Sequence, residues 1–159
     1  MKKSLYTLFL GLMLAVSPLF AQEEAPDTKI KKVTEDVLTI VRQDKDIQSG
    51  NTKKAIDLVE ARVIPHFNFQ RMTALAMGRD WNKASPEQKT RLSEEFKTLL
   101  VRTYSNALTS YRDQTLRYKP FKMQPGETDV VIKTEIVQPG AKPIELNYSL
   151  EKQGNDWKV

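Results

Sequence analysis

The sequence predicts an α+β domain in which several helices pack on one face of a curved antiparallel sheet. Two observations support this fold class. Apolar residues recur at helical spacing from Asp27 to Tyr111, and after Asp113 they recur at every second residue. The segments QPGET, QPGAKP and QGND separate the alternating stretches, so the strands should follow one another as a meander. Helices that precede a meander are typical of an α+β domain.

The first two helices are predicted from their apolar faces. The first should begin with Asp27 as its N-cap. The segment DIQSGN should form the turn that follows. The second should run from about Thr52 until Pro65 interrupts it. The inward-facing residues are expected to be Ile30, Val33, Val37, Ile40 and Val41 in the first helix and Ile56, Val59 and Val63 in the second.

Two further helices carry clearer start signals. Asn68 is placed to cap a third helix, and Gly78 is placed to end it. The segment SPEQ combines an N-cap, Ser85, with a proline in the first turn and a glutamine, Gln88, that completes a capping box. The long helix that follows should reach about Tyr111. Its wide apolar face is expected to contain Leu92, Phe96, Leu99, Leu100, Thr103, Tyr104, Leu108 and Tyr111.

The strands are predicted by alternation of apolar and polar side chains, which is typical of a sheet with one covered face. The covered face should carry Leu116, Tyr118, Val130, Ile132, Ile136, Ile144, Leu146, Tyr148 and Leu150. A fourth strand begins at DWKV, where the sequence stops. Because proteins usually avoid an unpaired edge strand, we expect the natural protein to continue.

The N-terminal segment has the layout of a secretory signal peptide. Lys2 and Lys3 precede an apolar run at residues 5–16, and the small residue Ala21 favours cleavage before Gln22. The run is too short to span a bilayer, which needs about 20 apolar residues. The expected organisation is a signal peptide at 1–21, a flexible leader at 22–26 and one domain at 27–159 that is truncated at its C-terminus.

The composition argues against several function classes. The chain has no Cys, and its single His, His66, has no acidic residue near it in sequence to orient a catalytic imidazole. No glycine-rich loop of the phosphate-binding kind is present. Basic residues are dispersed among acidic ones, unlike the basic patch of a nucleic-acid-binding protein. We therefore expect no catalytic residue, no metal, no cofactor and no nucleic-acid partner.

One segment, PHFNFQRMTALAMGRDW at residues 65–81, concentrates large apolar side chains around His66. Such side chains either fill an ordinary core or line a pocket for an apolar ligand. Bulky residues also occur on the long helix and on the predicted sheet, so both walls of a pocket are available. Composition alone does not choose between a solid core and a pocket.

Four motifs follow one another along the chain: P-x-F-x-F-x-x-M from Pro65, G-x-x-W-x-x-A from Gly78, Q-x-x-R-L from Gln88 and F-x-x-L-L-x-x-T-Y from Phe96. Their order and spacing resemble the MlaC family, also called toluene-tolerance proteins. The resemblance spans about residues 30–159. Many members have an acidic residue where this chain has Asn68, and the family continues past the final WK into a closing strand and a C-terminal helix. The matching residues are Pro65, Phe67, Phe69, Met72, Gly78, Trp81, Ala84, Gln88, Arg91, Leu92, Phe96, Leu99, Leu100, Thr103, Tyr104, Tyr148, Trp157 and Lys158.

The resemblance implies a periplasmic carrier on a cone-like fold of the nuclear-transport-factor type, with glycerophospholipid acyl chains between helices and sheet. Such carriers exchange lipid with an outer-membrane lipoprotein–porin complex and with the MCE-domain subunit of an inner-membrane ABC transporter, which maintains outer-membrane lipid asymmetry. The lipid pocket is expected to be lined by Phe67, Phe69, Met72, Leu75, Trp81, Phe96, Leu100, Tyr104, Leu108, Val130, Ile132, Ile144, Leu146 and Tyr148.

Two alternatives stay open at this point. One is a small-molecule enzyme or a non-lipid binding domain on a similar cone-like fold, and the other is a structural domain with a solid core. The inward strand positions are apolar, which argues against the enzyme. No Lys or Arg occurs among the inward positions, so a lipid headgroup is expected to stay in solvent.

Overall fold

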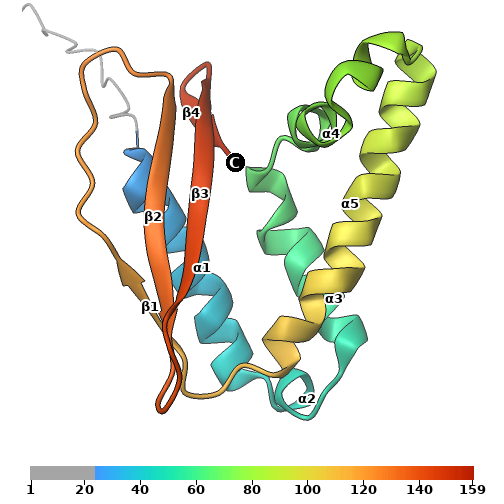
Figure 1. The fold of residues 1–159 in the computed structure, drawn as a ribbon. Helices are drawn as coiled ribbons and strands as arrows, with labels where there is room; N and C mark the ends of the chain where they lie inside the picture. Colours follow the sequence, from blue (N-terminus) through green and yellow to red (C-terminus); the bar gives the residue numbers. More distant parts are fainter. Residues whose placement is uncertain (1–23) are drawn as a thin grey trace, which may run out of the picture.

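The computed structural model describes residues 24–159 and confirms the α+β fold class (Figure 1). The expected signal peptide at residues 1–21 lies outside the described residues. The first helix begins at Pro26, which is the last residue of the expected leader. The elements are α1 (Pro26–Gln43), α2 (Lys45–Gln48), α3 (Thr52–Arg62), η1 (Ile64–His66), α4 (Phe69–Met77), η2 (Gly78–Lys83), α5 (Pro86–Thr109), β1 (Thr115–Tyr118), β2 (Asp129–Val137), β3 (Ile144–Gln153) and β4 (Asp156–Lys158).

The helix starts at Asn68 and Ser85 are confirmed. The side chain of Asn68 accepts the backbone N–H of Arg71 at 3.1 Å. The hydroxyl of Ser85 accepts the N–H of Gln88 at 3.2 Å, and the Gln88 side chain accepts the N–H of Ser85 at 2.8 Å. Each bond satisfies a backbone donor that the first turn of a helix leaves without a partner. Gly78 ends α4 with a φ of 57°, a conformation that favours glycine.

The capping box of α5 gives a first prediction. Replacing Ser85 with Ala should lower the free energy of unfolding by about 1 kcal/mol, because the N–H of Gln88 loses its acceptor. Thr90 is a matched control, since its hydroxyl bonds only to the Pro86 carbonyl inside the helix, and Thr90→Ala should cost nothing. Urea unfolding followed by circular dichroism measures both. Equal effects of the two substitutions would contradict the capping role.

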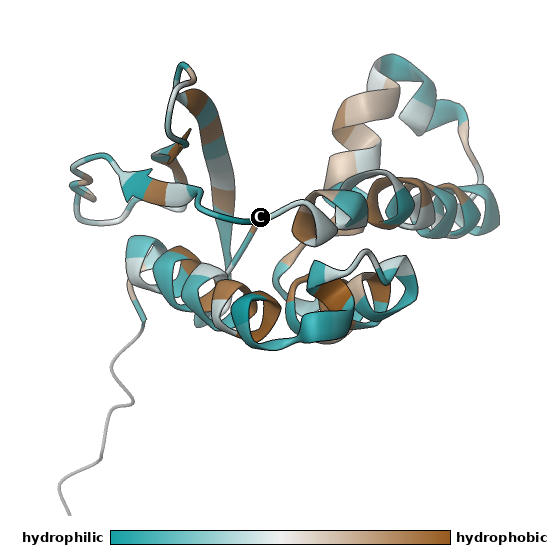
Figure 2. Cartoon of the chain, turned by 90° about the horizontal axis from the view of Figure 1, so that it is seen from below, coloured by the Kyte–Doolittle hydropathy of each residue, from teal (hydrophilic) through white to brown (hydrophobic). Residues whose placement is uncertain are grey.

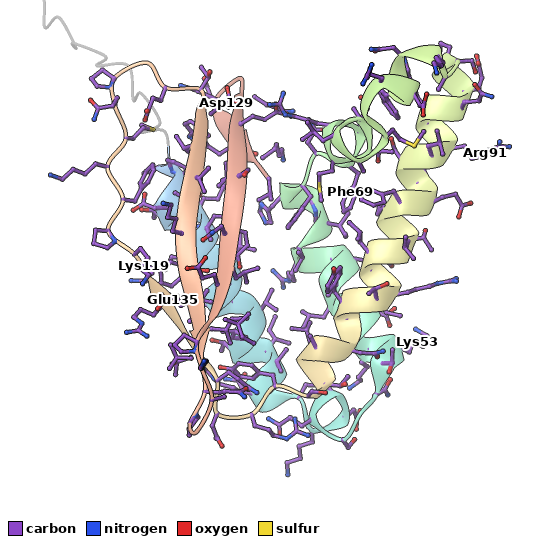
Figure 3. All side chains as sticks on the ribbon, viewed as in Figure 1. Lys53, Phe69, Arg91, Lys119, Asp129 and Glu135 are labelled. Carbon is purple, nitrogen blue, oxygen red and sulfur yellow. The ribbon has the colours of Figure 1, made fainter. Side chains whose placement is uncertain are left out.

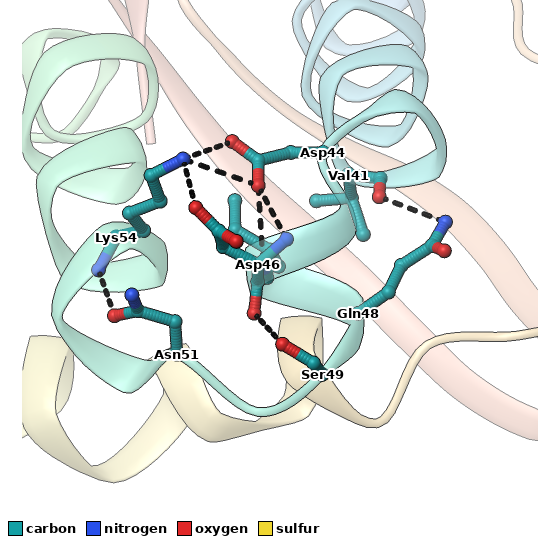
Figure 4. Close-up of polar contacts among 8 residues, drawn as sticks. Val41, Asp44, Asp46, Gln48, Ser49, Asn51 and Lys54 are labelled. Carbon is teal, nitrogen blue, oxygen red and sulfur yellow. Dashed lines mark hydrogen bonds and ion pairs between the residues drawn. The ribbon is translucent and has the colours of Figure 1, made fainter.

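Two local predictions near α1 were wrong. Asp27 lies within the first turn of α1, and the N-cap position is Ala25, which makes no side-chain cap bond. DIQSGN was expected to be a turn, but Asp46–Gln48 belong to the short helix α2. The side chain of Asp44 caps α2 by accepting the N–H groups of Asp46 and Ile47, and Lys54 of α3 bonds the same carboxylate at 3.1 Å (Figure 4).

The four strands form an antiparallel meander in the order β1-β2-β3-β4. The hydropathy colouring alternates along its strands (Figure 2). Ile132 pairs with Tyr148, and Ile136 pairs with Ile144, so the apolar residues of β2 and β3 share one face, as predicted. On the other face Glu135 forms ion pairs with Arg117 and Lys119 (Figure 3).

The helix α1 joins two separate core clusters. Ile30, near its start, packs with the sheet residues Val130, Ile132, Leu150 and Trp157. Val37 and Val41, near its end, pack with Ile47, Ala55 and Leu58 of α2 and α3. Val33 and Thr34, which lie between these residues along α1, belong to neither cluster.

The predicted inward faces of α3 and α5 were partly wrong. In α5 the buried residues are Ser93, Val101 and Ser105, whereas Leu99 and Tyr104 are 59% and 66% exposed. The helix α5 packs against α3 and α4, and small buried side chains allow helices to approach closely. In α3 the fully buried residues are Ala55 and Leu58, while the predicted Ile56, Val59 and Val63 are half-buried.

Candidate functional site: a pocket along α1

An apolar pocket of about 470 Å³ lies along α1, and it is called the α1 pocket below. One wall comes from α1 itself. Its residues are Ile30, Val33, Thr34, Val37 and Leu38. These positions follow the helical period, so a single face of α1 serves both core clusters and the pocket.

The second wall of the α1 pocket is the inner face of the sheet. It consists of Leu116, Ile136, Ile144, Leu146 and Tyr148. The third wall comes from the region of η1 and from the end of α5. Its main apolar residues are Val63, Phe67, Ala107, Leu108 and Tyr111. Ile144 and Leu146 are 57% and 38% exposed, so the pocket is open on the side where β3 begins.

The structure brings five of the fourteen expected pocket residues into this lining. They are Phe67, Leu108, Ile144, Leu146 and Tyr148. The sheet residues among them follow from the two-residue period, which assigns alternate side chains to one face.

The other nine expected residues lie elsewhere. Val130 and Ile132 share the sheet face of the pocket but are buried beneath Ile30 in the core. Leu75 and Tyr104 are 73% and 66% exposed. Met72, Leu75 and Val130 line a second groove of about 720 Å³ between α4 and the sheet, and Phe96 lines a third of about 400 Å³. Three of the nine are half-buried and line none of these pockets, namely Phe69, Trp81 and Leu100.

The expected residues on α4 and α5 other than Leu108 lie outside the α1 pocket because of the orientation of these two helices. Their large side chains were expected to face the sheet, but α5 packs on both α3 and α4. Figure 3 shows Arg91 on α5, on the side of the helices that is far from the strands. The helix that faces the sheet across the pocket is α1.

One end of the α1 pocket carries charge. Lys29 lines this end together with His66 and Trp157. The side chain of Lys29 is only 7% exposed, and its ammonium donates to Asp156 Oδ1. Lys158 donates to Asp156 Oδ2 at 3.0 Å and to the Pro65 carbonyl at 2.7 Å. Sequence reasoning missed Lys29, because its partner Asp156 is 127 residues away along the chain.

The environment of Asp156 favours its ionised form. Partial burial opposes the charge, but hydrogen bonds from Lys29 and Lys158 outweigh burial and lower the pKa of Asp156 to about 2. A carboxyl group whose pKa is lower in the folded state stabilises the fold above its unfolded pKa, near 3.8. That contribution is lost as the pH falls through about 2.

This shift predicts a pH dependence of stability. The wild type should lose unfolding free energy as the pH falls from about 4 to about 2. Asp156→Asn should lose less over the same range, because it has no carboxyl group to protonate at this position. The effect should be modest, since 49% of the Asp156 side chain is exposed and solvent screens the pair. Asp57→Asn, which removes an exposed carboxylate paired with Lys53, is the control. Parallel acid profiles for the wild type and Asp156→Asn would contradict the assignment.

His66 is half-buried at the same end of the pocket. Partial burial, together with the positive charges of Lys29 and Lys158, lowers the pKa of His66 below its ordinary value. The imidazole is therefore neutral at pH 7. Its backbone carbonyl accepts the N–H of Val159 at 2.9 Å, and the Val159 carbonyl accepts the N–H of Asn68 at 2.8 Å. These bonds connect the end of the sheet to the segment between η1 and α4.

Within residues 24–159, no three His, Asp or Glu side chains are grouped in a way that could hold a metal ion. The helices of this part of the chain are also too short or too polar to cross a bilayer.

Comparison with known sequences identifies the family. The profile of the MlaC protein family matches residues 31–159. This chain belongs to the MlaC family. The toluene tolerance protein ttg2D of Pseudomonas putida is 27% identical over 151 residues, covering 93% of this chain and 69% of that protein. The intermembrane phospholipid transport system binding protein MlaC of Haemophilus influenzae is 26% identical over 148 residues, covering 91% of this chain and 61% of that protein.

A solved structure of similar fold contains a lipid. It is the phospholipid-binding protein from Ralstonia solanacearum in complex with a phospholipid. It is 40% identical to this chain and has a TM-score of 0.78 over 86% of this chain and 75% of that one. The chain thus shares the fold of that phospholipid-binding protein, and it spans 61–69% of the length of the two curated relatives.

Proposed function

We propose that this chain binds glycerophospholipid acyl chains in the α1 pocket and carries the lipid through the periplasm. The observation that supports this function best is the apolar pocket of about 470 Å³ between α1 and the inner face of the sheet. The phospholipid bound to the Ralstonia relative of the same fold adds support.

The size of the pocket fits a lipid chain. Taking a methylene to be about as large as a water molecule, about 30 Å³, a volume of 470 Å³ holds roughly 16 such groups. This is the length of about one acyl chain. Further chain can lie against the exposed side chains of Ile144 and Leu146 at the open side. Each methylene removed from water contributes about 0.8 kcal/mol.

The same energetics require partners. A lipid in a bilayer has already removed its chains from water, so transfer into the pocket gains little free energy. The direction of transport must then come from other proteins. We propose an outer-membrane lipoprotein–porin complex and the MCE-domain subunit of an inner-membrane ABC transporter as those partners. The name of the Haemophilus relative, an intermembrane phospholipid transport binding protein, supports this role.

Native mass spectrometry tests lipid binding. The protein, purified from cells without detergent, should retain a ligand whose mass and fragments identify it as a glycerophospholipid. A protein that is folded by circular dichroism but carries no lipid, and takes none from phospholipid vesicles, would contradict the proposed function.

A substitution in the sheet wall tests the location. Leu146→Trp should displace about two methylenes of the ligand, and the loss of about 1.6 kcal/mol weakens lipid binding roughly tenfold. Asn147→Trp is the matched control, because the neighbouring side chain is exposed on the opposite face of β3. Lipid per protein, measured after exchange with vesicles, should fall only for Leu146→Trp. Equal occupancy in the two variants would place the lipid elsewhere.

A further inference from the structure

The charged end of the α1 pocket has more hydrogen-bond donors than acceptors. A lysine ammonium carries three N–H donors. Lys29 donates one of them to Asp156, and within residues 24–159 the other two have no acceptor. The indole N–H of Trp157 also has no acceptor in this part of the chain. Because a buried donor without an acceptor is unfavourable, this end of the pocket favours a ligand that brings acceptor oxygens.

The charges at this end are also unbalanced. Lys29 and Lys158 each carry one positive charge, whereas Asp156 supplies the one negative charge that both bond. His66 is neutral at pH 7, since burial and the two lysines lower its pKa. The ion-paired cluster of Lys29, Lys158 and Asp156 therefore has a net charge of +1, with Glu24 as a further negative charge near His66. A phosphodiester with a single negative charge would neutralise the cluster.

The position of the cluster allows a headgroup to remain partly in solvent. The Lys29 side chain is 7% exposed, but its partner Asp156 is 49% exposed and the Lys158 side chain is 26% exposed. The cluster therefore extends from the pocket wall to the surface. A phosphate held there would leave its outer substituent in water and direct the acyl chains along α1.

We propose that Lys29 binds the phosphate group of the lipid headgroup at this end of the α1 pocket. This proposal rests on the proposed lipid-binding function and replaces the expectation that the headgroup stays in solvent because no Lys or Arg occurs among the inward positions. A phosphate group fits this end of the pocket better than an ester carbonyl does, because the cluster carries a net positive charge as well as hydrogen-bond donors without acceptors. Charge-assisted hydrogen bonds of this kind are about twice as strong as neutral ones.

The test uses His66 as a reporter, because it is the only histidine in the chain. Protein without an affinity tag is loaded with phosphatidylglycerol or with diacylglycerol of the same acyl chains. Mass spectrometry confirms the loading, and NMR follows the His66 imidazole through a pH titration. Both lipids bury the imidazole, but only phosphatidylglycerol adds a negative charge beside it. The pKa of His66 should therefore be higher with phosphatidylglycerol than with diacylglycerol.

Several charged groups near His66 also influence its pKa. The groups that act on its pKa are Lys29 on α1, Asp156 and Lys158 on β4, and Glu24 before α1. Lys29→Met should raise the pKa of His66 in the lipid-free protein, because a nearby positive charge is lost. It should also abolish the difference between the two lipids and weaken phosphatidylglycerol binding about tenfold.

Two variants make the result specific. Lys31→Met removes the same charge from an exposed position on α1 that does not line the pocket, and it should behave as the wild type. Lys29→Arg keeps the charge and should retain the difference between the lipids. Inorganic phosphate is titrated as a separate ligand. A rise in the pKa of His66 would show that the phosphate group binds without acyl chains, and Lys29→Met should abolish that rise.

Two outcomes would overturn the proposal: the same His66 pKa with both lipids in the wild type, or a difference that persists in Lys29→Met. In either case a loaded protein would leave the lipid-binding function intact. A protein that loads neither lipid would instead contradict the proposed function itself, so the two failures are distinguishable.

Discussion

Trp157→Ala is expected to lower the free energy of unfolding by about 3–5 kcal/mol. The indole is 1% exposed and packs against Ile30 of α1 and against Val130, Ile132 and Leu150 of the sheet. Its removal leaves a cavity where the helix and the sheet meet. Since a domain of this size is usually stable by about 5–15 kcal/mol, the loss should be visible as a large drop in the urea midpoint.

The second tryptophan of the chain is the control for this substitution. Trp81 lies half-buried in η2, with its ring 5.5 Å from the Lys89 ammonium. Trp81→Ala should cost only about 1 kcal/mol, because it removes a surface contact. Urea unfolding followed by far-ultraviolet circular dichroism compares them without depending on tryptophan fluorescence. Similar losses for both variants would show that Trp157 does not hold the sheet to α1.

Leu38→Glu is expected to weaken lipid binding by about 100-fold or more at pH 7. Leu38 lines the α1 pocket but belongs to neither core cluster. In the lipid-free protein water can hydrate the new carboxylate, so the fold should persist. When acyl chains fill the pocket the carboxylate loses that water, and burying an unpaired charge costs several kcal/mol.

The neighbouring position supplies the control. Thr39 is exposed on the same helix, so Thr39→Glu adds the same charge outside the pocket and should leave lipid binding unchanged. Binding to Leu38→Glu should recover as the pH falls, because a protonated carboxyl group costs less to bury. Competition with a fluorescent phospholipid measures both effects. Unimpaired binding in Leu38→Glu would exclude this part of α1 from the site.

Much of the fold could be predicted because its signals are local. The capping box of Ser85 and Gln88 and the cap at Asn68 depend on residues three positions apart. The alternation in β2 and β3 assigns Ile136 and Leu146 to one face of the sheet regardless of what covers it. Signals of this kind need no knowledge of tertiary partners.

The orientation of the helices could not be predicted in the same way. A stripe of large residues such as Leu99 and Tyr104 indicates an apolar side of α5, yet the structure buries Val101 and Ser105. The contact is decided by the fit against α3 and α4, which the period of one helix does not contain. The same limit explains why α1 was not expected to form a pocket wall.

Lys29 shows a further limit of sequence reasoning. A lysine beside Ile30 is expected to lie in solvent at the edge of the helix, because lysine is rarely buried without a partner. Its partner Asp156 comes from the last strand, and no spacing rule connects the two positions. The charged end of the pocket therefore emerged only from the three-dimensional arrangement.

The most direct measurement of the central claim is contact between acyl chains and leucine methyl groups. Protein with ¹³C-labelled leucine methyls, loaded with phospholipid, should show nuclear Overhauser effects from chain methylenes to Leu38, Leu108 and Leu146, which line the α1 pocket. Leu75 and Leu99, 73% and 59% exposed on α4 and α5, should show none. Contacts confined to Leu75 and Leu99 would contradict the account, because the lipid would then lie outside the pocket along α1.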